Sequence, residues 1–213
     1  MKPLAVGLAL AAAASGNEWA CLALGLGAWA ALWRGVERKE TLWTVLAAGA
    51  SAAAVDLTLA RSTLLFYLHP ELAGLEWAVG PSVARGALIA VALEVYLYAR
   101  RSRSSLAAGA SAGLAGFCFG LLMDALGVRR GLWVWNAALI PDITALEAPL
   151  FVPFAWGTTF AFSGFYIHMT ARIKRRLPPI ARPIGSGLMC GTALGGFLLF
   201  YLLLFWSFAG RSM

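Results

Sequence analysis

Charged residues are scarce in this chain, and their scarcity excludes an ordinary soluble domain. Only 13% of its 213 residues are charged, whereas 61% are hydrophobic. A soluble domain is about one quarter charged and about half apolar. Several stretches of about 20 residues carry one charge or none, which is the length that a helix needs to cross a bilayer. The composition therefore predicts one all-α integral-membrane domain over residues 1–213, in a plasma membrane or a bacterial-type inner membrane.

Histidine and cysteine are also rare, which argues against a metal centre. The two histidines, His69 and His168, lie far apart in the chain. The three cysteines, Cys21, Cys118 and Cys190, fall inside apolar runs and lack the spacing of metal or redox motifs. We therefore expect neither a metal ion nor another cofactor.

The basic residues gather in three clusters, and their placement argues against nucleic acid as the reason for the net charge of +7. The clusters are Arg34, Arg38 and Lys39; Arg100, Arg101 and Arg103; and Arg172, Lys174, Arg175, Arg176 and Arg182. They occupy alternate loops between apolar runs, as cytoplasmic loops do under the positive-inside rule. Membrane lipids, and not nucleic acid, are the expected partners of these clusters.

The apolar runs predict a bundle of six transmembrane spans. They cover residues 3–33, 41–68, 81–99, 105–127, about 146–172 and 184–208. Residues 15–19 (SGNEW) interrupt the first run, where we expect one long tilted helix or a broken one, which would give seven segments.

Glycines at helical spacing predict close helix packing in two of these runs. They are Gly109, Gly113, Gly116 and Gly120 in the fourth run and Gly187, Gly191 and Gly195 in the sixth. Whether such faces also join subunits in a homo- or hetero-oligomer is open at this point.

A shift of about 68 residues aligns two stretches of the chain without a gap. It places Asp56, Arg61, Leu64, Tyr67 and Pro81 on Asp124, Arg129, Leu132, Trp135 and Pro149. Membrane folds with internal repeats often bind their ligand between the copies. If the two stretches are repeats, Asp56 and Asp124 are expected to face one shared cavity.

Acidic residues inside apolar runs are the candidates for a functional site. An acid at the bilayer centre costs about 2.5–3.5 kcal/mol on insertion scales, so it normally faces a cavity or a partner. Asp124 ends a face of small residues that begins at Gly113, and this face is expected to line a pocket. The alternative is structural: Asp124 pairs with Arg129, and nearby tryptophans belong to an interfacial aromatic belt.

An acid in a dry cavity lined by aromatic rings has a specific chemical use. Burial disfavours the charged carboxylate, so the acid keeps its proton and can deliver it to a C=C bond. Aromatic faces then stabilise the carbocation. We expect a lipid-soluble isoprenoid as the substrate, Asp124 as the general acid, and Glu147 or Asp56 as a proton relay or terminating base. The expected substrate-binding residues are Trp133, Trp135, Trp156, Tyr67 and Glu94.

Residues 124–136 (DALGVRRGLWVWN) and 147–156 (EAPLFVPFAW) resemble small membrane proteins of carotenoid biosynthesis. These are the non-flavin lycopene cyclases and the bacterioruberin-type carotenoid hydratases. The resemblance lies on Asp124, Gly131, Trp133, Trp135, Pro149, Pro153 and Trp156. It implies an acid-initiated, metal-independent cyclase or hydratase, in reaction terms an isomerase or a lyase. In the cyclases a proline precedes paired acids, whereas here the single acid Glu147 precedes the proline.

A non-catalytic membrane protein is the second interpretation of the same residues. Intramembrane acids, glycine-rich helices and a repeat also fit a small-solute transporter, a proton transporter or an accessory subunit. A transporter would show helix breaks at corresponding positions of both halves. Pro149 and Pro153 lie near the start of the fifth run, whereas the third run has Pro81 at its edge, which slightly favours the enzyme.

Overall fold

A computed structural model describes residues 2–35, 39–68, 79–162, 178 and 181–209, and this part of the chain is mostly helical. The elements are α1 (Lys2–Ala14), α2 (Glu18–Gly35), α3 (Lys39–Arg61), β1 (Leu65–Tyr67), α4 (Val79–Ala99), α5 (Ser105–Arg129), β2 (Trp133–Trp135), β3 (Thr144–Ala145), β4 (Ala148–Pro149), α6 (Phe151–Ala161) and α8 (Ala181–Ala209).

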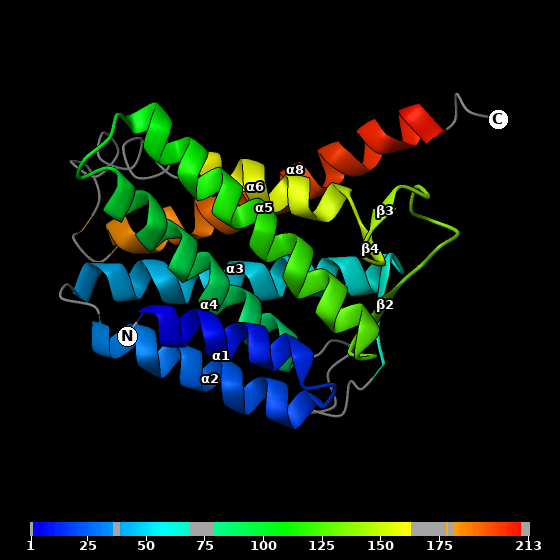
Figure 1. Cartoon of the computed structure of the whole chain (residues 1–213), viewed down its shortest axis with the longest axis horizontal. Helices are drawn as coiled ribbons and strands as arrows, with labels where there is room; N and C mark the ends of the chain where they lie inside the picture. Colours follow the sequence, from blue (N-terminus) through cyan, green and yellow to red (C-terminus); the bar gives the residue numbers. More distant parts are fainter. Residues whose placement is uncertain (1, 36–38, 69–78, 163–177, 179–180, 210–213) are drawn as a thin grey trace.

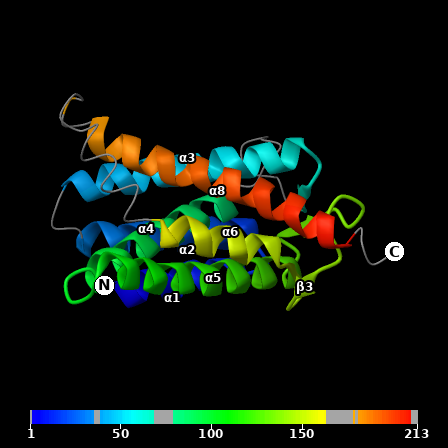
Figure 2. The same ribbon diagram turned by 90° about the horizontal axis from the view of Figure 1, so that it is seen from above.

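The helices lie along a common direction in two layers (Figures 1 and 2). α3 and α8 pack against each other in one layer, while α1, α2, α4, α5 and α6 form the other. Two described segments, residues 105–129 and 187–209, are long and apolar enough to cross a membrane by length and composition. The end of the fifth predicted span lies outside the described residues.

The first apolar run is broken and forms a helical hairpin. Gly16 has a φ of 66°, which ends α1. The Asn17 side-chain oxygen accepts the N–H of Ala20 at 3.0 Å and caps the start of α2. α1 and α2 then run side by side in opposite directions (Figure 1). Of the two alternatives for residues 3–33, the structure has the broken one.

The small-residue face of α5 packs against α6. A Cβ atom at Gly113 would lie 3.0 Å from the Cβ of Ala161, and one at Gly120 would lie 2.9 Å from the Trp156 side chain. Because these two glycines of α5 have no side chain, the backbones of α5 and α6 can approach closely. Our expectation that this face lines an open pocket as far as Asp124 is wrong, because α6 covers it.

α5 ends in a Schellman motif, which turns the chain back over the last helical turn. Gly131 has a φ of 68°, and its N–H donates to the carbonyl of Val128 at 3.0 Å. The N–H of Leu132 donates to the carbonyl of Gly127 at 2.9 Å. This turn explains why β2 begins directly beside the end of α5.

α3 ends in the same motif. Thr63 has a φ of 60°, and its N–H donates to the carbonyl of Ala60 at 3.1 Å. The N–H of Leu64 donates to the carbonyl of Leu59 at 3.2 Å. These four positions are those that the sequence shift aligns with the motif at the end of α5.

The strands that follow the two motifs pair with each other. β1 and β2 are antiparallel, with Phe66 opposite Val134 at the centre of the pair. Equivalent residues face each other at the centre when a two-fold axis relates two antiparallel segments. Phe66 and Val134 are equivalent under the sequence shift, so the strand pair has the local two-fold relation that a repeat requires.

Replacing Thr63 by glycine is expected to stabilise the protein. A left-handed backbone costs an L-residue about 1–2 kcal/mol, whereas glycine adopts it freely. The larger unfolded-state freedom of glycine offsets about 0.4–1 kcal/mol of this gain, which leaves about 1 kcal/mol or less. Thermal unfolding in detergent, followed by circular dichroism, measures the change. The reverse exchange, Gly131→Thr, should lower stability; an equal loss in both variants would contradict the conformational explanation.

Candidate functional site

The described residues of the three basic clusters and the strands lie at opposite ends of the helices (Figure 1). Lys39 begins α3, Arg182 lies in the first turn of α8, and residues 100–103 connect α4 to α5, all at one end. The strand pairs β1–β2 and β3–β4 lie at the other end. Arg38 and residues 172–176 lie outside the described residues, as do His69 and His168.

Asp124 is the centre of a buried polar cluster at the strand end. Its side chain is on the last turns of α5, and the residue is 2% exposed. One carboxyl oxygen accepts the indole N–H of Trp133, and the other accepts that of Trp135, both at 2.9 Å. Each oxygen of this acid therefore has an oriented hydrogen-bond donor.

Strand geometry and a glycine bring both indoles to the acid. Successive side chains of a strand alternate between its faces, so Trp133 and Trp135 share one face. Both are buried, whereas Val134 between them is exposed. Gly127 makes room for this arrangement, because a Cβ atom there would overlap the Trp133 ring.

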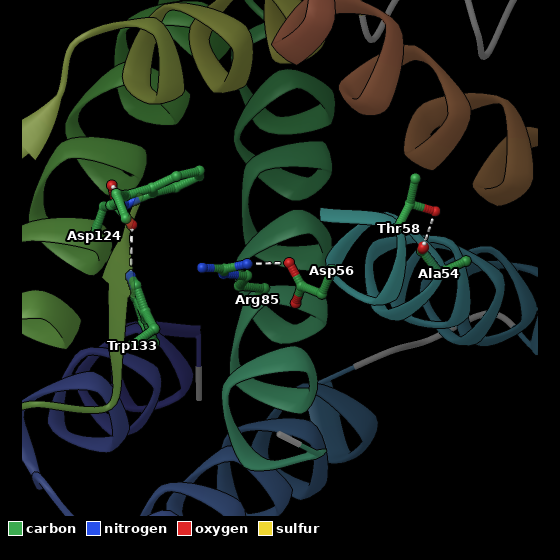
Figure 3. Close-up of polar contacts among 7 residues, drawn as sticks. Ala54, Asp56, Thr58, Arg85, Asp124 and Trp133 are labelled. Carbon is green, nitrogen blue, oxygen red and sulfur yellow. Dashed lines mark hydrogen bonds and ion pairs between the residues drawn. The ribbon is translucent and has the colours of Figure 1, made fainter. Parts of the chain in front are cut away.

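Arg85 connects Asp124 to the second acid of the predicted pair. Its guanidinium forms a buried ion pair with Asp56 and lies 4.7 Å from the centre of the Trp133 ring. Figure 3 shows Arg85 of α4 between Asp56 of α3 and the Asp124–Trp133 pair. The two acids thus belong to one cluster, in which Arg85 and Trp133 stand between them.

Glu147 lies outside this cluster, at the tip of the β3–β4 hairpin. Leu146 and Glu147 have φ values of 53° and 70°, as a two-residue turn between these strands requires. The Glu147 carboxylate is exposed and lies 3.3 Å from Nε of Arg129. α6 begins only at Phe151, so Glu147 precedes that helix and does not open it.

The predicted substrate-binding residues are only partly gathered at the site. Trp156 of α6 is buried against α5. It packs on Gly120, which lies one helical turn before Asp124 on α5. Tyr67 pairs with Trp133 through the β1–β2 ladder, but its side chain lies outside the described part of the structure. The same is true of the side chain of Glu94 on α4.

Sequence reasoning missed three residues that shape this site. They are Arg85, Gly127 and Phe151, whose ring meets that of Trp135 edge to face at a centroid distance of 5.3 Å. The signal for Arg85 was available, because an arginine inside an apolar run usually pairs with another charged group or with backbone carbonyls. Gly127 and Phe151 carry no comparable signal in one sequence.

Comparison with known proteins identifies no relative, since no family model, no curated protein and no solved structure matches the chain. The described part of the chain is mostly helical and contains two apolar helices of membrane-spanning length and a buried acid–indole–arginine cluster. The chemistry of that cluster is the basis for assigning a function.

Proposed function

We propose that this protein is an integral-membrane enzyme that protonates a C=C bond of a lipid-soluble isoprenoid, as a cyclase or a hydratase. The observation that supports this proposal most strongly is the buried carboxyl group of Asp124 with an indole N–H on each oxygen. Asp124 is the proton donor, Trp133 and Trp135 orient it, and no metal takes part.

The two indoles make Asp124 suited to giving up a proton. Burial favours the neutral acid before the reaction. The two N–H groups stabilise the carboxylate that remains after proton transfer, and they are already oriented towards it. Asp56 and Arg85 cancel each other's charge, so a protonated Asp124 leaves these three groups neutral overall. Proton delivery then leaves a carboxylate beside the new carbocation, and both are close to aromatic rings.

The proposed reaction balances without any co-reactant other than water. The O–H bond of Asp124 breaks, its proton forms a C–H bond with one alkene carbon, and the π electrons leave a cation on the other carbon. In cyclisation a second C=C bond attacks the cation, and loss of a proton returns Asp124 to its acid form. In hydration, water captures the cation and supplies the returning proton. The indole of Trp135 moves aside when the alkene reaches the acid, so the N–H of Trp133 stabilises the carboxylate during proton transfer and that of Trp135 returns to it afterwards.

The wider architecture in this proposal is a membrane bundle of seven helical segments, because the first of the six apolar runs forms the α1–α2 hairpin, with two related halves. The matching Schellman motifs and the β1–β2 pair support the repeat. The two halves differ at the site, because the shift aligns Trp133 with Leu65, which has no side-chain donor. The basic end would face the cytoplasm, and the acid cluster would lie near the opposite membrane surface.

Expression in a host that accumulates linear carotenoids tests the proposed reaction. Extracted lipids are compared by mass spectrometry with those of a host that carries an empty vector. A product of unchanged mass but shifted retention indicates cyclisation, and a gain of one water indicates hydration. Arg129→Gln serves as a control, since an exposed ion pair is worth about 0–1 kcal/mol and should not affect turnover. No change in any isoprenoid would count against the enzyme.

A further inference from the structure

An apolar groove of about 630 Å³ runs between α3 and α8. Its volume lies within the range of about 300–1,000 Å³ that is usual for ligand pockets. Ala50 to Ser62 line one side and Leu188 to Leu202 the other. At about 1.5 Å per helical residue, these stretches make the groove roughly 20 Å long.

The groove offers almost no polar partner to a ligand, and none of its lining residues is charged. Thr58, Ser62 and Thr192 each donate their hydroxyl hydrogen to a carbonyl of their own helix, at 2.8–2.9 Å. Figure 3 shows this bond for Thr58, which leaves α3 on a different side from Asp56. These hydroxyls have no free hydrogen to donate, so an occupant with polar groups would regain few of the hydrogen bonds that it makes with water. The groove therefore suits an uncharged hydrocarbon chain.

One end of the groove lies next to the acid cluster. Leu64 and Phe151 line this end. The Phe151 ring contacts Trp135, whose N–H donates to Asp124. The side chains of Phe151 and Trp135 thus separate the end of a chain in the groove from Asp124.

We infer that the α3–α8 groove holds the linear hydrocarbon chain of an isoprenoid, with its reactive end at Phe151. The choice of an isoprenoid rather than an acyl chain rests on the proposed function. The elongated shape, the internally bonded hydroxyls and the position of Phe151 support the binding of a single apolar chain. Displacement of Trp135 at this end then brings the terminal C=C bond to Asp124.

Photocrosslinking in detergent–lipid micelles tests this inference without requiring turnover. Squalene carrying a diazirine serves as the probe, and mass spectrometry of peptides locates the attachment. Labelling is expected on residues 50–62 and 188–202. Ala54→Phe places a ring in the groove and should lower this labelling about tenfold, the effect of displacing a few methylene groups. Ala110→Phe is the matched control, because Ala110 is also exposed but lies on α5 between Leu106 and Leu114.

The possible outcomes distinguish failure of the groove inference from failure of the proposed enzymatic function. Groove labelling without any lipid product supports the binding site and counts against the proposed function. A lipid product whose yield is equal in Ala54→Phe and Ala110→Phe, with labelling spread evenly over α5 and α8, overturns the groove inference. A phospholipid with a diazirine in its acyl chain is the second probe. If it labels the groove as strongly as squalene does, the occupant is a membrane lipid and the inference is also overturned.

Discussion

Replacing Asp124 by asparagine is expected to lower stability and to abolish turnover, for two separate physical reasons. The carboxyl group accepts one indole N–H on each oxygen. An amide has only one oxygen, so its NH₂ group would face the N–H of Trp133 or Trp135. A buried donor without an acceptor costs about 1–3 kcal/mol. Loss of the acid removes general acid catalysis, commonly worth about 10²–10⁴-fold.

A triple variant separates these two effects. Asp124→Leu combined with Trp133→Phe and Trp135→Phe removes the acid and both N–H groups together while it keeps one aromatic ring at each position. Replacing all partners by apolar groups of similar shape can be nearly neutral for stability. We therefore expect the triple variant to unfold at a higher temperature than Asp124→Leu alone, and yet to form no product. Thermal unfolding in detergent and lipid mass spectrometry are the two measurements.

The structural alternative predicts the opposite pattern of activity. If the cluster only stabilises the packing of β2 on α5, the triple variant should have higher turnover and higher stability than Asp124→Leu. If the triple variant does not fold, the turnover of Asp124→Asn per amount of folded protein distinguishes the catalytic role from the structural one. Full specific activity in either variant would remove Asp124 from the catalytic mechanism.

The helical class and the core of the site followed from the sequence because both depend on local patterns. A long apolar run predicts a helix whatever that helix later packs against. Accordingly, α4 and α5 begin within two residues of their predicted starts. Asp124 and the indoles are close in sequence, and one Schellman turn suffices to bring them together. Gly131 is the signal for that turn.

The ion pairs were harder to predict, because they depend on helix rotation and on distant contacts. Residues five apart on a helix point about 140° away from each other, so Arg129 does not follow Asp124 to its buried side. It pairs with Glu147 instead. Arg85 reaches Asp56 from another helix, and the sequence does not specify which faces of α3 and α4 meet.

Breaking the Asp56–Arg85 pair from one side is expected to be the most destabilising change at the cluster. Asp56 is 2% exposed and Arg85 is 7% exposed, so either charge alone would remain buried. Removing one partner of a buried ion pair costs about 3–5 kcal/mol, whereas replacing both by apolar residues is often neutral. Asp56→Leu and Arg85→Met should therefore each lower stability strongly, and the double variant should recover most of the loss.

Turnover by the double variant shows whether Arg85 also positions the acid. Its guanidinium lies over the Trp133 ring, and the Trp133 N–H holds Asp124. If this contact orients the acid, the folded double variant should have a kcat lowered by about tenfold with an unchanged KM, since orientation affects the reaction and not groove binding. Arg103→Gln, at the far end of the molecule, is the control for loss of an arginine. An unchanged kcat in the stable double variant would leave Asp56 and Arg85 with a structural role alone.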